Sequence, residues 1–513
     1  MRTLVIIALA YILFIHGLGG TALWDPDEPR QAIMAREMVQ RADYIHPYLN
    51  GSPYLEKPPL YSWLIIFASK LTGGIDEFAS RLPSAIAATL LLLLTYFFGK
   101  RLDHEVSGFL SALILATNYQ FLGNARESVM DMSFAFFIGL AVFLGYLCVE
   151  KGKKGLLPLA LLPCALAIVT KGPVGIIVPV AVLFFYCIAT KNLKAMFGPL
   201  VLGFLLALAV ASLWFGLAGK AYMKEFILHQ NINRFTTGFD HVEPFTYYFQ
   251  KLFTNFLPWS IALPFAAFFA FRRRLWLPLI WLLVTFVFFD ISKSKRAIYL
   301  LSCYPACALL VGIYLKERWY VLVEKGWTTV ILSILSLGLL ALPALLFPAM
   351  HRVPMIQEML GKDPLFPAAL VVIFAASGLA FLLSILQKSP GKGFLALFIY
   401  LVCLGFLYHS LYLPFMDKEQ KSVTLITDAM HGAQKRHPVY MYGFNSPALI
   451  YYVGKPVTIL QSPAELPAEK DDIIVVVEDK GGNTEPFKGL FPSAKSVRYE
   501  RADYVVFTGA HAR

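Results

Sequence analysis

Residues 82–99 read LPSAIAATLLLLLTYFFG, a stretch without a single charged side chain. A helix needs about 18 to 20 mostly apolar residues to cross a lipid bilayer. Similar stretches recur on both sides of this one, and of the 513 residues of the chain 58% are hydrophobic and 15% are charged. Soluble domains carry about 25% charged residues. The sequence therefore predicts a polytopic α-helical membrane protein.

Working outward from residues 82–99, we expect about thirteen transmembrane helices. Residues 60–71 are amphipathic and too short to span, so they are predicted to form a juxtamembrane helix on the membrane surface. The N-terminal stretch resembles a signal peptide, but Gly17–Ala22 is a poor cleavage site, so a retained first helix is predicted. The expected spans are 3–22, 82–99, 107–123, 131–149, 155–170, 172–190, 197–217, 256–271, 275–290, 298–315, 327–348, 364–386 and 392–414.

Short basic loops alternate with longer polar ones along the chain. Cytoplasmic loops carry an excess of Lys and Arg, so the basic set predicts the orientation and places the N-terminus in the cytoplasm. Most of the net charge of +12 has this explanation, which argues against a nucleic-acid partner. The predicted cytoplasmic loops hold Lys100 and Arg101, Lys151 to Lys154, Lys191 and Lys194, Arg272 to Arg274, Lys316 to Lys325, and Lys388 and Lys392.

The opposite face then receives the polar segments and the C-terminus. Two domains are predicted: a transmembrane catalytic domain, 1–414, with large outer loops at 23–81 and 218–255, and a small α/β domain, 415–513. The six cysteines all lie in apolar stretches, and they form no CxxC pair, so neither a disulfide framework nor a Cys-based zinc site is indicated. In the tail, strands are expected at 438–442, 449–453, 457–460, 473–477 and 504–508, and helical structure around 422–435.

The first outer loop contains two dense groups of charges, Asp25-Pro26-Asp27-Glu28-Pro29-Arg30 and Tyr54-Leu55-Glu56-Lys57-Pro58-Pro59. Charge beside a bilayer is costly to desolvate and marks functional sites. The prolines are expected to hold the first carboxylates out of a helix that starts at residue 31. A carboxylate here suits a general base or a metal ligand, and Lys57 suits a phosphate. Helix capping and surface ion pairs are the alternatives.

Further polar groups lie in the other outer loops. Asp131 is a candidate metal ligand or helix cap, and Lys171 a phosphate-binding or snorkelling cation. Aromatic and polar residues interleave in 218–255, which suits sugar recognition or an interfacial belt. Residues 292–299 are basic on the face where basic residues are rare, which argues for an anionic ligand.

The chain contains no GxGxxG, Walker A or suitably placed DxD sequence, so no nucleotide cofactor is expected. Its polar face also points away from the cytoplasm, where nucleotide sugars are made. An activated sugar donor on that face is therefore expected to be lipid-linked.

Together these motifs resemble the GT-C fold glycosyltransferases of the protein mannosyltransferase superfamily, and most of all the bacterial lipid A aminoarabinose transferases. The similarity runs from about residue 5 to 310. It is carried by Asp27-Glu28-Pro29-Arg30, Glu56-Lys57-Pro58-Pro59, Phe78-Ala79-Ser80-Arg81-Leu82-Pro83-Ser84, Arg126 to Asp131, Thr170-Lys171-Gly172-Pro173, Arg234-Phe235, Pro258-Trp259 and Ser292 to Tyr299. Gln31 stands where the family often has Tyr, so a contact to donor or acceptor differs.

The resemblance implies a multi-pass protein of the bacterial inner membrane, with its active site and C-terminal domain in the periplasm. It implies that a polyprenyl (undecaprenyl) phosphate sugar is the donor and lipid A or another envelope molecule the acceptor. Asp27 and Lys57 match the catalytic positions, and Glu56 and Asp131 match carboxylates of a site for a divalent ion such as zinc. A histidine in the region 229–241, either His229 or the favoured His241, would complete that site. The residues expected to bind substrate or phosphate are Arg30, Arg81, Arg126, Lys171, Arg234, Lys293, Arg296 and Tyr299.

The role of Asp27 depends on the acceptor. For a hydroxyl acceptor Asp27 is expected to be the general base, and for a phosphate acceptor it is expected to position that acceptor or stabilise positive charge on the sugar. A protein O-mannosyltransferase-like enzyme is one alternative function. A polyprenyl-lipid transporter is another, but it would show paired repeats and charges at mid-span. A non-catalytic scaffold leaves the one-sided charge clusters unexplained.

Overall fold

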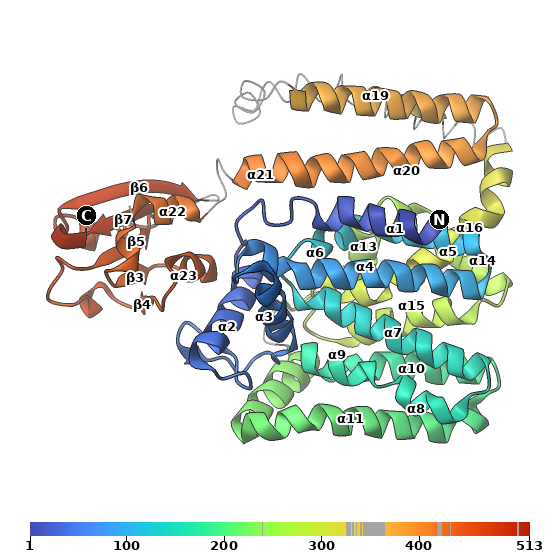
Figure 1. Ribbon diagram of the computed structural model, residues 1–513, viewed down its shortest axis with the longest axis horizontal. Coiled ribbons are helices and arrows are strands. Elements are labelled where there is room, and N and C mark those ends of the chain that lie inside the picture. The colour runs from blue at the N-terminus through green and yellow to red at the C-terminus, as the bar shows by residue number, and fades with distance from the viewer. Residues whose placement is uncertain are drawn as a thin grey trace.

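The computed structural model describes residues 1–238, 240–324, 365–417, 423–430, 432–499 and 502–512, with some positions between 330 and 341. A bundle of helices is followed by a small sheet domain at one end of the bundle (Figure 1). The first helix starts well away from that end, so the N-terminus and the sheet domain lie toward opposite ends of the bundle (Figure 1). This arrangement agrees with the orientation that the loop charges predict.

Most of the bundle consists of apolar helices, and the buried side chains of most of these helices form one core, whereas Phe381, Ile385 and Ala396 form a small separate cluster. The helices are α1 (Arg2–Ala10), α4 (Glu77–Leu102), α5 (Glu105–Ala116), α6 (Tyr119–Ala125), α7 (Met130–Glu150), α8 (Leu157–Ala160), α9 (Pro163–Lys171), α10 (Val174–Ala189), α11 (Leu193–Met223), α12 (Arg234–Thr236), α13 (Tyr247–Asn255), α14 (Leu263–Arg272), α15 (Trp276–Ile291), α16 (Tyr304–Glu324), α19 (Leu365–Leu386), α20 (Pro390–Leu407) and α21 (Leu413–Met416).

By length and composition, six helices among the described residues can cross a membrane, or seven if the bent pair α5 and α6 is one span. Shorter apolar helices of 10–17 residues, such as α10 and α15, accompany them. The count of about thirteen spans stays a prediction, and most of the expected span 327–348 lies outside the described residues. The expected span 107–123 is broken, because the chain bends by 71° between α5 and α6. Asn118 caps α6 at this bend by accepting a hydrogen bond from the Phe121 N–H at 2.7 Å.

Two helices of the first outer loop lie at the end of the bundle that faces the sheet domain (Figure 1). They are α2 (Asp27–Arg41) and α3 (Leu60–Thr72), and α3 confirms the helix predicted at 60–71. The start predicted for α2 is wrong, because the helix begins at Asp27 rather than at residue 31. Proline is tolerated in a first helical turn, whose N–H groups have no intrahelical partner, and carboxylates are favoured there by the helix dipole.

The C-terminal domain contains a five-stranded mixed sheet in the order β4-β3-β5-β7-β6. β3 pairs in parallel with β4 and β5, and β7 pairs antiparallel with β5 and β6. The central strand β5 is buried on both faces, which explains its continuous apolar sequence. The strands are β3 (Val439–Tyr442), β4 (Thr458–Leu460), β5 (Ile474–Glu478), β6 (Ser493–Tyr499) and β7 (Ala502–Thr508), and the helices are α22 (Thr424–Ala429) and α23 (Pro447–Val453). A two-residue hairpin, β1 (Tyr48–Leu49) and β2 (Ser52–Pro53), lies in the first outer loop.

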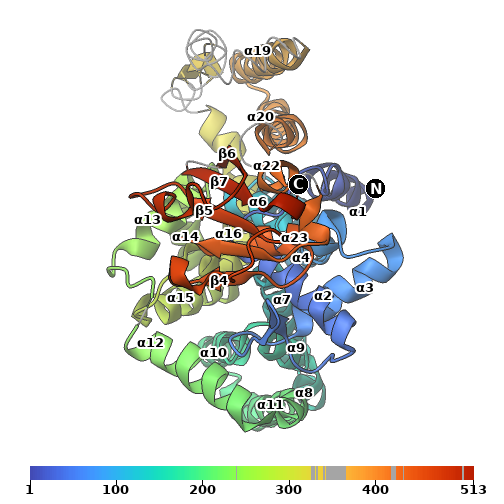
Figure 2. The ribbon, with the colours of Figure 1, turned by 90° about the vertical axis from the view of Figure 1, so that its left-hand side faces the viewer.

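The predicted small α/β domain is confirmed, with two differences inside it. The expected strand 449–453 is helix α23, because Ser446 caps its N-terminus and Pro447 occupies its first position. Strand β6 was not predicted, because its residues are largely polar and exposed at the edge of the sheet. α23 connects β3 to β4 and contacts α2, so the sheet domain is joined to the first outer loop, as Figure 2 shows from the side of the sheet domain.

Candidate active site

The first outer loop is held in place by the C-terminal domain. Asp25 accepts hydrogen bonds from the Ser446 hydroxyl and from the Ala448 N–H, the latter at 2.7 Å, at the start of α23. Arg36 donates to the carbonyl oxygens of Tyr451, at 2.7 Å, and of Ile450, at 3.4 Å, at the other end of the same helix. Both ends of α23 therefore bind residues that flank Asp27.

A buried ion pair between Glu28 and Arg81 fixes the first outer loop to α4. The Arg81 guanidinium donates to both carboxylate oxygens of Glu28, at 2.7 and 2.8 Å, and both side chains are about 95% buried. Glu28 also accepts from the N–H groups of Trp24 and Ser128, at 3.0 and 2.7 Å. The other guanidinium N–H groups of Arg81 reach carbonyl oxygens of residues 18, 21 and 22.

This geometry corrects the prediction that Arg81 binds phosphate. Every N–H of its guanidinium group has an acceptor inside the protein, so none is left for a ligand. The two partners lie 53 positions apart in the chain, on α2 and α4. Arg81 therefore fixes the end of the loop rather than binding substrate.

Asp27 lies one residue before this pair, and its carboxylate faces a different set of cations. Its Oδ2 accepts from Arg296 Nη2 at 2.7 Å, and its Oδ1 lies 3.4 Å from Arg30 Nη1. Burial raises the pKa of the Asp27 carboxyl, but attraction and hydrogen bonding to Arg296, with smaller contributions from Arg30 and Lys57, outweigh it, so the pKa is lowered overall. Asp27 is therefore ionised at neutral pH.

Four of the predicted residues come together in one pocket, which we call the cationic pocket: Lys57, Lys171, Arg234 and Tyr299. The Lys171 ammonium lies 4.2 Å from the centre of the Tyr299 ring and forms an ion pair with Asp131. Arg234 forms an ion pair with Asp240. Residues far apart in the sequence thus converge from the first outer loop, α9, α12 and the chain that precedes α16.

Lys57 is poised to change its charge near physiological pH. Burial lowers the pKa of its ammonium to about 8, and repulsion from Arg234 and Lys171 acts in the same direction. No carboxylate within ion-pair distance of Lys57 is found among the described residues, whereas its two neighbouring cations each have one. An anionic ligand in this pocket would supply the missing counter-charge.

The other predicted cations are distributed over the site and its surroundings. Arg30 and Arg296 line a narrow pocket between Lys57 and Asp27, and the Nε of Arg30 is buried there without a hydrogen-bond partner among the described residues. Arg126 lines a separate large cavity. Lys293 is exposed and borders neither the cationic pocket nor the narrow pocket, so the structure does not place it with the other cations.

The residues predicted to bind a metal are not gathered into one centre. Glu56 accepts a hydrogen bond from the Tyr54 hydroxyl at 2.9 Å, Asp131 pairs with Lys171, and His241 is exposed on its loop. Within the described ranges, no group of three or more His, Cys, Asp or Glu side chains is arranged to hold a metal ion. As they are placed, these residues do not fit a metal ion, so no step of the proposed reaction involves one. The metal requirement stays a prediction.

The pockets form a continuous series through shared residues. The cationic pocket and the narrow pocket share Lys57, Lys171 and Tyr299. The narrow pocket in turn shares Asp27 and Arg296 with a wider pocket of about 350 Å³, which we call the central pocket. Asp27 therefore lies between the narrow pocket, which leads to the cations, and the larger central pocket.

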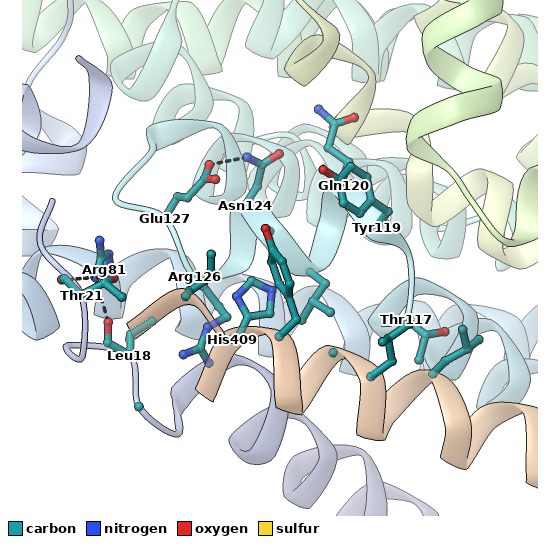
Figure 3. A pocket seen from close by; sticks show the side chains of 18 of the residues that line it. Leu18, Thr21, Arg81, Thr117, Tyr119, Gln120, Asn124, Arg126, Glu127 and His409 are labelled. Carbon is teal, nitrogen blue, oxygen red and sulfur yellow. Dashed lines mark hydrogen bonds between the residues drawn. The ribbon is translucent and has the colours of Figure 1, made fainter. Parts of the chain in front are cut away.

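The central pocket lies next to a cavity of about 870 Å³, and the two share lining residues that include Trp24, Gln120, Asn124 and Glu127. Figure 3 shows the polar side of this large cavity, with Glu127 and Asn124 joined by a hydrogen bond and Arg126 and His409 nearby. Its other side is apolar and is lined by Leu401, Leu404 and Gly405 of α20 and by Leu122 and Leu257. The cavity therefore suits an amphipathic molecule.

Sequence reasoning missed several residues that line this cavity. Gln120, Asn124, Glu127 and His409 were not predicted as site residues, although Asn124 and Glu127 belong to the outer stretch 124–131 that contains Arg126 and Asp131. The available signal was a carboxylate and an amide three residues apart within that outer stretch. Gln120 and His409 lie within apolar stretches and carry no such signal.

Known proteins resemble this chain both in sequence and in fold. Residues 56–215 match the family described as dolichyl-phosphate-mannose-protein mannosyltransferase. A protein of Aquifex aeolicus is 30% identical over 380 residues, which cover 72% of this chain and 75% of the relative. The undecaprenyl phosphate-alpha-4-amino-4-deoxy-L-arabinose arabinosyl transferase of Pseudomonas aeruginosa is 31% identical over 402 residues, 74% of this chain and 71% of the relative.

The fold matches a solved structure over nearly its whole length. The crystal structure of ArnT from Cupriavidus metallidurans bound to undecaprenyl phosphate superposes with a TM-score of 0.76 and 22% sequence identity, covering 99% of this chain and 98% of that one. This likeness confirms the predicted GT-C fold. With the sequence identity to the arabinosyl transferases over more than two thirds of their length, it follows that the chain is a membrane-embedded glycosyltransferase and belongs to the family of undecaprenyl phosphate-alpha-4-amino-4-deoxy-L-arabinose arabinosyl transferases.

Proposed function

We propose that the protein transfers 4-amino-4-deoxy-L-arabinose, or a closely related sugar, from undecaprenyl phosphate to lipid A or another envelope acceptor. The reaction would take place at the periplasmic face of the bacterial inner membrane. The observation that carries the proposal is the position of Asp27, which lies between the cations of the narrow and cationic pockets and the central pocket. The names of the relatives, which specify this donor and sugar, support it.

The donor phosphate fits the cationic pocket. Lys57, Lys171 and Arg234 supply positive charge there, and Tyr299 supplies a hydroxyl. As the bond between sugar and phosphate breaks, negative charge grows on the departing phosphate, and fixed cations in a partly buried site stabilise that charge. The apolar groove between α10 and α11, lined by Ile177, Phe184 and Phe204 among others, offers a surface for part of the lipid chain.

The activity is expected to fall as the pH rises through about 8, the pKa to which burial lowers the Lys57 ammonium. Below that pH the free enzyme carries a charged Lys57 that can meet the phosphate, and above it the neutral amine cannot. The measurement is kcat/KM for the lipid-linked donor between pH 6 and about 10. A Lys57→Ala variant should show a much lower kcat/KM and no decline near pH 8. A decline that persists unchanged in the variant would contradict this role.

Asp27 is placed to act on the sugar. Its lowered pKa makes it a weak base but keeps it negatively charged, so it is suited to stabilise the positive charge that develops on the sugar ring. This role needs no proton transfer, which suits an acceptor phosphate that is already ionised. The general-base role applies if the acceptor is a hydroxyl.

The acceptor fits the large cavity. An amphipathic lipid would place its acyl chains along the apolar side near α20 and its phosphate near Arg126, whose guanidinium donates to the Leu13 carbonyl at 3.0 Å and has no ion-pair partner among the described residues. Burial and repulsion from Arg81 lower the pKa of Arg126 to about 10, so Arg126 is still charged at neutral pH. These features favour lipid A over a protein acceptor, which the mannosyltransferase likeness alone would suggest.

Mass spectrometry of lipid A and envelope glycans tests the proposal, on cells with and without the protein. The expected result is lipid A with the added mass of one aminopentose that depends on the protein. An added sugar on envelope proteins, with unchanged lipid A, would instead favour the protein glycosyltransferase. Unchanged envelope molecules in cells shown to make the donor would overturn the proposal.

A further inference from the structure

The proposed reaction gives no role to the carboxylate of Glu127. Glu127 follows Arg126 in the loop between α6 and α7, and it lines both the central pocket and the large cavity. The Asn124 side-chain amide donates to its Oε2 at 2.7 Å (Figure 3). Glu127 thus lies outside the cationic pocket, in the central pocket that Asp27 and Arg296 also line.

The other carboxylates of the central pocket all have strong partners. Asp27 pairs with Arg296, Glu28 with Arg81, and Asp25 accepts from the start of α23. Glu127 takes part in none of the ion pairs that the described residues form, and its hydrogen bond comes from a neutral amide. A partly buried carboxylate without a cation is costly unless a ligand supplies one.

Asn124 provides a second, independent sign of a ligand. Its side chain is 8% exposed and lines the central pocket beside Glu127. Because its Nδ2 donates to Glu127, its Oδ1 is the remaining group, and this buried oxygen has no hydrogen-bond partner in the described part of the chain. The wall of the central pocket therefore presents an unpaired carboxylate and an unpaired amide oxygen, which are both acceptors, and it calls for a ligand group with several donors and a positive charge.

We infer that Glu127, assisted by the Asn124 side-chain oxygen, binds the 4-ammonium group of the donor sugar and selects amino sugars over neutral ones. The inference rests on the proposed function, since it concerns the sugar that occupies the central pocket. A primary ammonium has three N–H donors, which matches the two acceptors and leaves one for water. With the phosphate among the cations and the anomeric carbon at Asp27, the far side of the sugar ring faces Glu127 and Asn124.

The charges around Glu127 agree with this role. Burial raises the pKa of its carboxyl to about 7, repulsion from Glu28 and Asp27 adds to the rise, and the Asn124 hydrogen bond and Arg81 oppose it. Tyr408, at the start of η6 (Tyr408–Tyr412), lines the large cavity together with Glu127. An ammonium group would favour the ionised carboxylate, so the amino sugar is expected to bind more weakly below about pH 7.

The test compares two donors, undecaprenyl phosphate bearing the 4-amino sugar and the same lipid bearing the 4-hydroxyl sugar, with purified full-length protein. Glu127→Gln keeps the shape and the Asn124 hydrogen bond but removes the charge. We expect it to lower kcat/KM for the amino donor about 30-fold or more, because one partner of a desolvated charge pair is lost. The hydroxyl donor should change by less than about threefold, within the range of neutral hydrogen-bond effects. Glu485→Gln, an exposed carboxylate of the tail, is the matched control.

The pH dependence provides a second readout. The wild type should lose kcat/KM for the amino donor as the pH falls through about 7, and this acidic limb should be absent in Glu127→Gln and with the hydroxyl donor. An equal loss with both donors, or no loss with either, would overturn the inference. If wild-type protein transfers neither sugar, the proposed function itself has failed, and that result differs from both. Should Glu127→Gln unfold, Asn124→Ala is expected to lower the amino-donor preference in the same direction and serves as the replacement test.

Discussion

Replacing Asp27 by Asn is expected to lower the rate of sugar transfer by about 100-fold to 1,000-fold, the range seen when one group that stabilises developing charge is removed. Asn has nearly the same shape as Asp, and its side-chain oxygen still accepts from Arg296, whose bond to Asp27 is 2.7 Å long. What is lost is the negative charge beside the sugar. The measurement is kcat for purified protein in lipid vesicles with saturating donor and acceptor.

A matched control separates this effect from damage to the loop. Asp43 follows α2 in the same loop and forms an ion pair with His46 at 3.0 Å, away from the pockets. Asp43→Asn should retain most of the activity. If Asp27→Asn keeps more than half of the wild-type rate, Asp27 is not the group that acts on the sugar, and the proposed site must be moved.

Breaking the Glu28–Arg81 pair is expected to have the largest effect on stability. Removing one partner of a buried ion pair leaves an uncompensated charge and costs about 3 to 5 kcal/mol in the free energy of unfolding. Arg81→Ala and Glu28→Gln should therefore both lower the unfolding temperature in detergent by many degrees. Arg81→Lys should also destabilise the protein, because lysine lacks the planar fork that meets both carboxylate oxygens at 2.7 and 2.8 Å.

Lys488→Ala provides the control for that experiment, because it removes one partner of the exposed Lys488–Glu485 pair in the tail. Its unfolding temperature should equal that of the wild type. The opposite outcome for Arg81 is also informative: an unchanged unfolding temperature with a large loss of donor affinity would restore the phosphate-binding role that the sequence predicted.

The sequence predicted helices and site residues correctly where a single physical rule determines them. The apolar stretches predicted α4, α7 and α10 because bilayer thickness sets their length. Loop charges predict that Lys57, Lys171 and Arg234 share one face of the membrane, and the structure brings all three into one pocket. The motif resemblance added the role of Asp27, which no local pattern reveals.

The errors arose where two rules compete or where partners lie far apart. Pro26 and Pro29 argued against a helix at Asp27, yet proline is harmless in a first turn, and α2 starts there. Residues 449–453 carry strand-forming side chains, but Ser446 and Pro447 start a helix. Arg81 looked like an isolated cation because its partner, Glu28, is 53 residues away. Glu127 was overlooked because its importance comes from the absence of a cation, which only three-dimensional packing reveals.

The contact between the first outer loop and the C-terminal domain was also beyond the sequence. Asp25, Arg36 and Asn50 bind the backbone or side chains of residues 446–457, about 400 positions away. Contacts between such distant residues produce no periodic pattern in the sequence. They tie the loop that holds Asp27 and Lys57 to the C-terminal domain.

The most direct measurement of the central claim is sugar transfer by the purified protein in lipid vesicles, with undecaprenyl phosphate carrying radiolabelled 4-amino-4-deoxy-L-arabinose and with lipid A as the acceptor. The account predicts that label moves to lipid A with wild-type protein and not with Asp27→Asn. Label that remains on the polyprenyl lipid with folded wild-type protein, or that moves equally fast with Asp27→Asn, would contradict it.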